Sequence, residues 1–216
     1  MTGQLSLRLE RSQTTDLTEI GGMISLRELI VTRTPVSDLR PLSALINLET
    51  LGLKLTRVTD LTPLAGLTKL RSLILSFNEI RDLAPLAGLT MLESCHLTGT
   101  MAGDIAPLAG LVRLTRLDLG GTRVATIEPL RSLTALLGLQ LAGTRVTDLS
   151  PLAGMTQLRF LDLGDTPVAD ITPLRSLTSL REIDLRGTKV TNIEPLPELK
   201  NCSIITASNP RRRRKT

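Results

Sequence analysis

The chain has 216 residues, 41% of them hydrophobic and 1% aromatic, and it carries 26 Lys and Arg against 21 Asp and Glu. The positive excess comes from the last six residues, 211–216, because the rest of the chain balances at 21 against 21 once their five cations are set aside. This distribution excludes a strongly basic body of the kind that binds nucleic acid over a broad surface.

The sequence shows no export or membrane signal. Residues 1–20 contain no apolar run of the length that a signal peptide needs, and no segment of the chain could span a membrane. We therefore expect a cytoplasmic protein without membrane contact. Export by a signal that composition does not reveal, such as that of a secreted bacterial effector, stays open.

One sequence pattern repeats along the chain with a fixed period. It begins as a half copy at residues 7–17, continues through a copy without proline at 20–38, and then carries a Pro-Leu pair at every 22nd residue. The pairs begin at Pro41, Pro63, Pro85, Pro107, Pro129, Pro151, Pro173 and Pro195. The pattern fades after Leu196, Leu199 and Ile205. A fixed period of this length indicates stacked repeats, because one copy cannot bury its own apolar side chains.

Two apolar spacings within each copy predict two kinds of structure. Leu64, Leu67 and Leu70 are three residues apart, which suits a helical or 3₁₀ turn with one apolar side. Leu73 and Leu75 are two residues apart, as in a strand whose alternate residues point in opposite directions. Proline is favoured at the start of the turn, and the Asp that usually stands three residues before the proline can accept hydrogen bonds from the turn's N–H groups. Each copy is therefore expected to form a short strand, a turn and a helical segment.

The pattern Leu-x-x-Leu-x-Leu-x-x-(Thr/Asn)-x-(Val/Ile)-x-Asp-Leu-x-Pro-Leu, as in residues 70–86, resembles the leucine-rich repeats. It is similar to their 22-residue subclass, found in the SDS22-like phosphatase regulators and the internalins, over roughly residues 5–208. The resemblance implies an α/β fold: a single right-handed solenoid, with a parallel sheet on the concave face and short helical or 3₁₀ segments on the convex face. One departure is Thr at the ladder position that is usually Asn, which only Asn78 retains. Since a hydroxyl offers fewer hydrogen bonds than an amide, we expect fewer bonds in these turns.

The uninterrupted period predicts one elongated domain over residues 1–210, with about nine to ten repeats, followed by a disordered basic tail at 211–216. Charged residues on the first strand and Pro210 near the last blunt the sheet edges, so we expect a monomer. Cys95 and Cys202 fall in core positions roughly 24 Å apart by strand spacing, too far for a disulfide. Both are expected to be buried free thiols.

The sequence offers no pattern for catalysis, for a metal ion or for a cofactor. The one histidine, His96, follows Cys95 in a predicted strand, so the two side chains point to opposite faces. They therefore cannot act together as a nucleophile and its base. We expect a protein that is not an enzyme.

Strand residues that point away from the core are the candidate binding residues, because partners of such solenoids dock on the concave face. Phe160 is the favoured anchor, since aromatic residues are over-represented among binding hot spots, whereas Phe77 suits packing against a neighbouring loop equally well. Strand propensity could instead explain the isoleucines, and a solvated face the carboxylates. The candidate set is Ile30, Ile74, His96, Arg116, Asp118, Gln140, Phe160, Asp162, Glu182 and Asp184.

These observations favour a non-catalytic module that binds an unidentified protein on its concave face, as an adaptor, a regulatory subunit or a bacterial effector. A second hypothesis is weak binding of nucleic acid or another acidic surface through the arginine tail. The body disfavours it, because the concave face turns acidic and offers no aromatic stacking platform. A third hypothesis makes the chain the repeat segment of a larger signalling protein.

Overall fold

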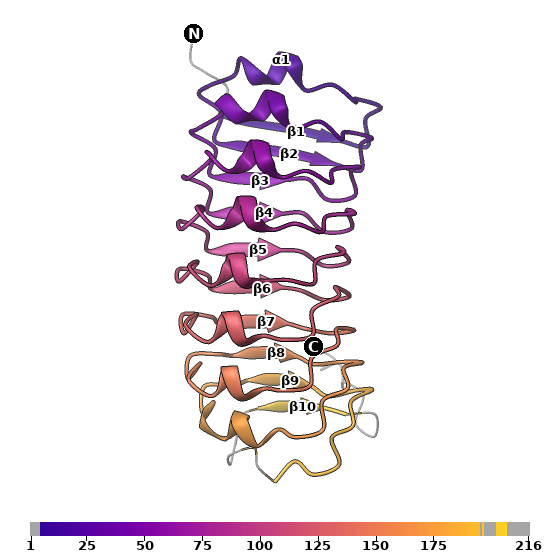
Figure 1. The fold of residues 1–216 in the computed structure, drawn as a ribbon, viewed down its shortest axis with the longest axis vertical. Helices are drawn as coiled ribbons and strands as arrows, with labels where there is room; N and C mark the ends of the chain where they lie inside the picture. The colour runs from indigo at the N-terminus through magenta and orange to yellow at the C-terminus, as the bar shows by residue number, and fades with distance from the viewer. Residues whose placement is uncertain (1–4, 195, 197–201, 207–216) are drawn as a thin grey trace, which may run out of the picture.

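The protein is described by a computed structural model that covers residues 5–194, 196 and 202–206. Over these residues ten parallel strands form one sheet in chain order (Figure 1), which confirms the predicted solenoid. The strands are β1 (Ser6–Glu10), β2 (Glu28–Thr32), β3 (Thr50–Gly52), β4 (Ser72–Ile74), β5 (Ser94–His96), β6 (Arg116–Asp118), β7 (Gly138–Gln140), β8 (Phe160–Asp162), β9 (Glu182–Asp184) and β10 (Ser203–Ile205). The predicted tail, 211–216, lies outside the described residues.

The second layer consists of short helical segments that stack on one side of the sheet (Figure 1). They are the α-helix α1 (Thr18–Gly21) and the 3₁₀ turns η1 (Arg40–Ala44), η2 (Thr62–Leu64), η3 (Ala84–Leu86), η4 (Ala106–Leu108), η5 (Glu128–Leu130), η6 (Ser150–Leu152) and η7 (Thr172–Ser176). Each 3₁₀ turn has its proline in the first two positions. The Asp before the proline acts as expected: in η2, Asp60 Oδ1 accepts the Thr62 N–H at 2.8 Å.

The core is one continuous stack of leucine-rich layers between the sheet and the 3₁₀ turns. Leu73 and Leu75 of one repeat are fully buried, as are their counterparts in the middle repeats. Burying one such side chain stabilises the fold by about 1.5–3 kcal/mol. On β1 the prediction of buried leucines is wrong, because Leu7 and Leu9 are only half-buried on the outermost strand.

The strand register follows the sequence period as far as β9. From β1 to β9 each residue pairs with the residue 22 positions further on. At the last pair the interval is 21, so Ile204 rather than Ile205 lies opposite Ile183. Because strand side chains alternate between faces, a shift of one residue changes which positions reach the core. Cys202, expected in a core position, is consequently only half-buried, whereas Cys95 is buried as predicted.

Strands β1 to β9 each leave the sheet through one residue with positive φ. These residues recur every 22 positions and have φ between 54° and 69°: Arg11, Arg33, Leu55, Phe77, Gly99, Gly121, Gly143, Asp165 and Gly187. At position 99 a side chain is disfavoured by the positive φ and also by space, because a Cβ there would lie 2.7 Å from the Phe77 ring. The Lys54 ammonium also lies over the Phe77 ring, 5.4 Å from its centroid. Phe77 therefore packs against its neighbours, as one of the two interpretations proposed.

The ladder residues differ in how many hydrogen bonds they make. Thr122 and Thr144 each donate one bond from the hydroxyl to a backbone carbonyl in their own repeat, at 2.6 Å. Asn78 instead bonds to two repeats, through Leu53 and Thr56 of one and Leu75 of its own. The amide thus links neighbouring repeats through side-chain hydrogen bonds, whereas these hydroxyls satisfy their own turn.

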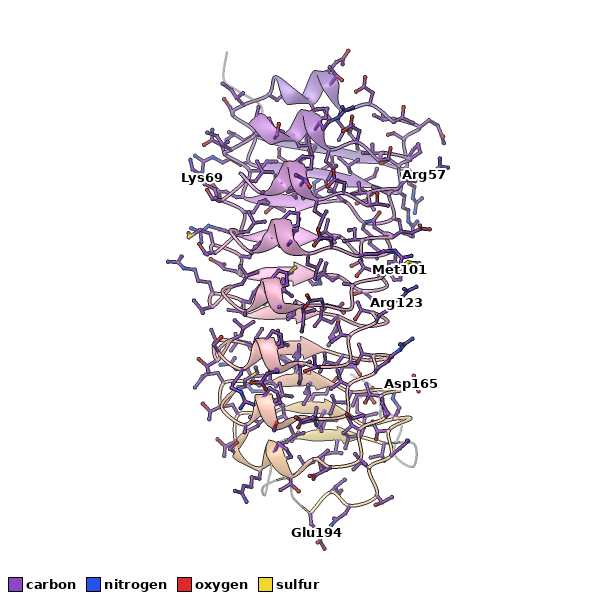
Figure 2. All side chains as sticks on the ribbon, viewed as in Figure 1. Arg57, Lys69, Met101, Arg123, Asp165 and Glu194 are labelled. Carbon is purple, nitrogen blue, oxygen red and sulfur yellow. The ribbon has the colours of Figure 1, made fainter. Side chains whose placement is uncertain are left out.

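Charged side chains project from the turns at both edges of the stack, such as Lys69 at one edge and Arg57 and Arg123 at the other (Figure 2). No helix among the described residues has the length and apolar character needed to cross a bilayer.

Candidate functional site

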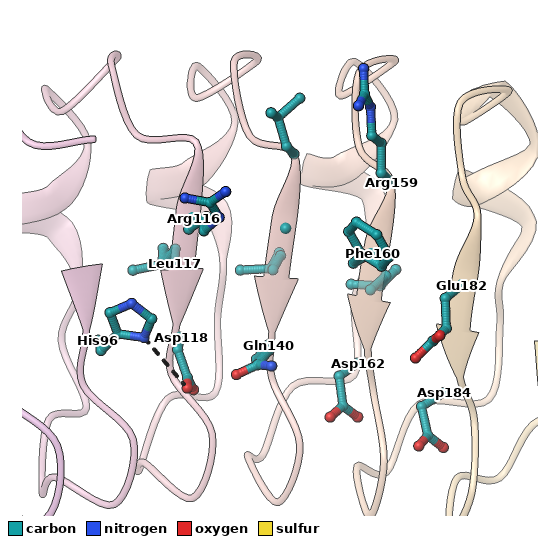
Figure 3. Close-up of a pocket in the computed structure, with 14 residues that line it drawn as sticks. His96, Arg116, Leu117, Asp118, Gln140, Arg159, Phe160, Asp162, Glu182 and Asp184 are labelled. Atoms are coloured by element: carbon teal, nitrogen blue, oxygen red, sulfur yellow. Dashed lines mark ion pairs between the residues drawn. The ribbon is translucent and has the colours of Figure 1, made fainter. Parts of the chain in front are cut away.

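A hollow of about 390 Å³ opens on the outward, concave face of the sheet over β5 to β9 (Figure 3). It brings together eight of the ten predicted residues: His96, Arg116, Asp118, Gln140, Phe160, Asp162, Glu182 and Asp184. The other two, Ile30 and Ile74, lie on β2 and β4, outside the hollow. Ile30 has a packing role, because its Cδ1 lies 2.8 Å from where a Cβ of Gly52 would stand.

The hollow exists because one strand position lacks a side chain. Arg116, Gly138 and Phe160 occupy matching outward positions on β6, β7 and β8. A Cβ added at Gly138 would meet nothing within 4 Å, so the space above it is open. Both flanking side chains are exposed, Phe160 to 52%. Figure 3 shows Arg116 and Phe160 on the two sides of this gap.

The candidate set left out six lining residues: the buried strand leucines Leu117, Leu139 and Leu161, together with Leu137, Gly138 and Arg159. Leu137 is half-buried and Arg159 exposed, and both stand just before their strands begin. The available signal was the glycine itself, since a glycine inside a strand often marks a place that another group approaches closely.

A second outward column carries most of the negative charge. Asp118, Gln140, Asp162 and Asp184 pair in register on β6 to β9. Asp118 and Asp162 each accept the backbone N–H of the glycine two residues on, at 2.9 Å. These bonds fix the carboxylates at the lower edge of the hollow in Figure 3.

The burial of Asp184 differs from expectation. It was predicted to be exposed, but its relative exposure is 7%. Arg186 covers it: the guanidinium Nε lies 3.0 Å from both carboxylate oxygens, and Nη2 bonds Oδ2. Ile205 of β10 lies beside it on the other side. The ion pair with Arg186 therefore accounts for the lost exposure of Asp184.

Asp162 lies in an environment that disfavours its negative charge. Partial burial raises its pKa above the usual value, and the nearby charges of Asp184 and Asp118 raise it further, while the Gly164 N–H and Arg186 oppose the shift. A carboxylate in this position gains from a cation brought close to it.

The histidine and cysteine do not form a catalytic pair. Cys95 is fully buried, and burial raises the pKa of its thiol to about 12, so it is an inert core residue. His96 lies on the opposite face, with Nε2 3.0 Å from the Ser94 hydroxyl and Nδ1 4.0 Å from Asp118. Among the residues described, no group of three or more His, Cys, Asp or Glu is placed to hold a metal ion. The arrangement suits noncovalent recognition by charge and shape.

Comparison with solved structures places the chain among repeat proteins. InlF, an internalin of Listeria monocytogenes, superposes with a TM-score of 0.86 at 30% identity, over 89% of this chain and 57% of its own. The chain therefore spans little more than half the length of that structure. Internalin C2 of the same organism matches with a TM-score of 0.82 at 34% identity, over 86% of this chain and 83% of its own. The plant peptide hormone receptor RGFR1, solved with RGF2, matches at 0.76 and 18% identity over 93% of this chain and 35% of its own, which shows a shared fold alone.

No curated protein gives a significant sequence match. A comparison with protein-family models agrees with the structural comparison. A family model described as leucine-rich repeats (2 copies) matches residues 46–88, 134–176 and 156–201, about half of the chain. Together with the ten-stranded solenoid and the likeness to internalin C2, these matches show that the chain belongs to the leucine-rich repeat family.

Proposed function

We propose that the chain is a non-catalytic module that binds a partner protein in the hollow of its concave face. The observation that supports this most is the exposed Phe160 beside an open gap, because exposed aromatic anchors next to pockets are the usual hot spots of interfaces. Polar and charged side chains surround this apolar centre, which is the common anatomy of a protein interface.

Within the family we assign the chain to the 22-residue subclass of the SDS22-like regulators and internalins. Its 22-residue register from β1 to β9 and its 30–34% identity with two internalins support that assignment. We further propose that it acts as an adaptor, a regulatory subunit or a bacterial effector, as a monomer, in the cytoplasm or after delivery as an effector.

Site-specific photo-crosslinking tests this proposal. A photo-reactive amino acid replaces Gln140, which is exposed in the hollow, or Ala106, which is exposed on η4 of the opposite layer. In a lysate of the source organism we expect protein adducts at position 140 and not at 106. Phe160→Ser should abolish them. The same adducts at both positions, or adducts at 140 that survive Phe160→Ser, would contradict binding in the hollow.

A further inference from the structure

The gap over Gly138 has the dimensions of a slot for one planar side chain. Arg116 and Phe160 stand on the strands to either side of it, so their backbones are about 9.5 Å apart by strand spacing. One planar group between two others needs about 7–8 Å, since carbon atoms pack best about 3.5–4 Å apart. Both walls favour an aromatic guest, because a guanidinium and a ring each stack on aromatic faces.

Two carboxylates flank the residue that lies next to the slot on the same strand. Gln140 lies two residues beyond Gly138 on the same strand, about 7 Å away. Asp118 and Asp162 flank Gln140 on the adjacent strands, so a cation held over Gln140 would lie between two carboxylates. The opposite rim has Arg159 and the apolar Leu137. Charge complementarity therefore places a basic group on the Gln140 side of the slot.

We propose that the hollow binds an extended segment of a partner protein that inserts an aromatic side chain over Gly138 and a Lys or Arg side chain over Gln140. In an extended chain, residues two apart share one face at about 7 Å, which equals the Gly138–Gln140 spacing. The recognised sequence is thus aromatic-x-basic, or basic-x-aromatic if the segment runs in the opposite direction. This inference rests on the proposed function and names the partner class of that site.

The structure also says what the hollow rejects. Acidic segments would face Asp118 and Asp162, with Glu182 nearby, and like charges in contact are disfavoured. Segments with a small residue at the aromatic position would leave the slot unfilled, and so forfeit the contact with Arg116 and Phe160.

Two probe peptides test the inference: acetyl-Ser-Trp-Ser-Arg-Ser-amide and the reverse order, acetyl-Ser-Arg-Ser-Trp-Ser-amide. They are titrated to millimolar concentration against the ¹⁵N-labelled full chain, with amide shifts as the readout. Control peptides replace Trp by Ala, which keeps the charge, or Arg by Glu, which keeps the ring. Gly138→Val fills the slot at an outward strand position with open space above it, where Val is well tolerated. Ser72→Val adds the same side chain in the same column on β4, outside the hollow.

We expect at least one Trp-Arg probe to shift the amides of Gly138 and Gln140, with at least tenfold weaker binding to Gly138→Val and unchanged binding to Ser72→Val. Equal binding of the Ala control, equal binding to Gly138→Val, or no shift with either probe would overturn the inference. Crosslinking at position 140 separates the two levels. If the adducts persist when Gly138→Val is added, binding on the concave face stands and the slot is rejected. If the position-140 chain that keeps Gly138 forms no adducts, the proposed function itself is rejected.

Discussion

Replacing Asn78 by Thr measures what the single ladder amide contributes to stability. Its Nδ2 donates to the carbonyl oxygens of Leu53 and Leu75 at 2.7 and 2.8 Å, and its Oδ1 accepts the N–H and the hydroxyl of Thr56 at 3.1 and 2.8 Å. A threonine hydroxyl at position 78 can make only the bond to the Leu75 carbonyl, because the Thr100 hydroxyl makes the equivalent bond to the Leu97 carbonyl at 2.8 Å. The other three hydrogen bonds are lost, at about 1 kcal/mol each, and other partners can replace them in part. The free energy of unfolding should therefore fall by about 2–3 kcal/mol.

Urea unfolding followed by far-UV circular dichroism is the suitable assay, because the chain has no Trp or Tyr to report by fluorescence. Thr122→Val is the matched control: it removes one hydroxyl bond of 2.6 Å, so it should cost about 1 kcal/mol. Losses that agree within about 0.5 kcal/mol in the two variants would refute the reasoning, because the bonds between repeats would then add nothing.

Three further predictions use the same assay. Leu119→Ala should cost about 2–5 kcal/mol through the cavity it leaves, whereas Gln140→Ala on the exposed face should stay within about 0.5 kcal/mol; equal losses would mean a wrong register. The Thr34 hydroxyl is buried without a partner among the described residues, so Thr34→Val should keep or raise stability, and a clear loss would reveal an unrecognised bond. The raised pKa of Asp162 means that the folded state binds its proton more tightly than the unfolded state, so ionisation of Asp162 lowers stability as pH rises. The free energy of unfolding of Asp162→Asn should therefore rise relative to that of the unsubstituted chain from about pH 3 to pH 7. A difference that stays constant over this range would contradict the prediction.

The repeat made most of the fold predictable. A constant 22-residue period sets both the number of strands and their register, because each strand pairs with its own copy one repeat later. The period says less at the ends. Leu7 and Leu9 match the core pattern but lie on the outermost strand, and Cys202 loses its core position because the last interval is one residue shorter. These departures depend on what adjoins the stack, which a local pattern does not contain.

The sequence predicts which residues of the candidate site point outward, but not how deeply each of them is buried. Alternation within each strand identifies the outward residues, and eight of the ten candidates line one hollow. Alternation does not report what neighbouring side chains cover: Asp184 points outward and is nonetheless buried beneath Arg186. It also gives no weight to a missing side chain, so Gly138, which makes the hollow, was overlooked.

Gly138 also predicts a conflict between stability and binding. Glycine inside a strand costs roughly 0.5–1 kcal/mol, because it loses more backbone freedom on folding and adds no packing. Its site is an outward strand position with open space above it, where a β-branched residue is favoured. Gly138→Val should therefore raise the free energy of unfolding by about 0.5–1 kcal/mol, while it removes binding of the aromatic-basic probes. A loss of stability in urea unfolding would show that the glycine serves the backbone of β7, and that its open space is only a by-product of folding. A gain would mean that folding alone does not favour glycine there, which is the behaviour expected of a position kept for recognition.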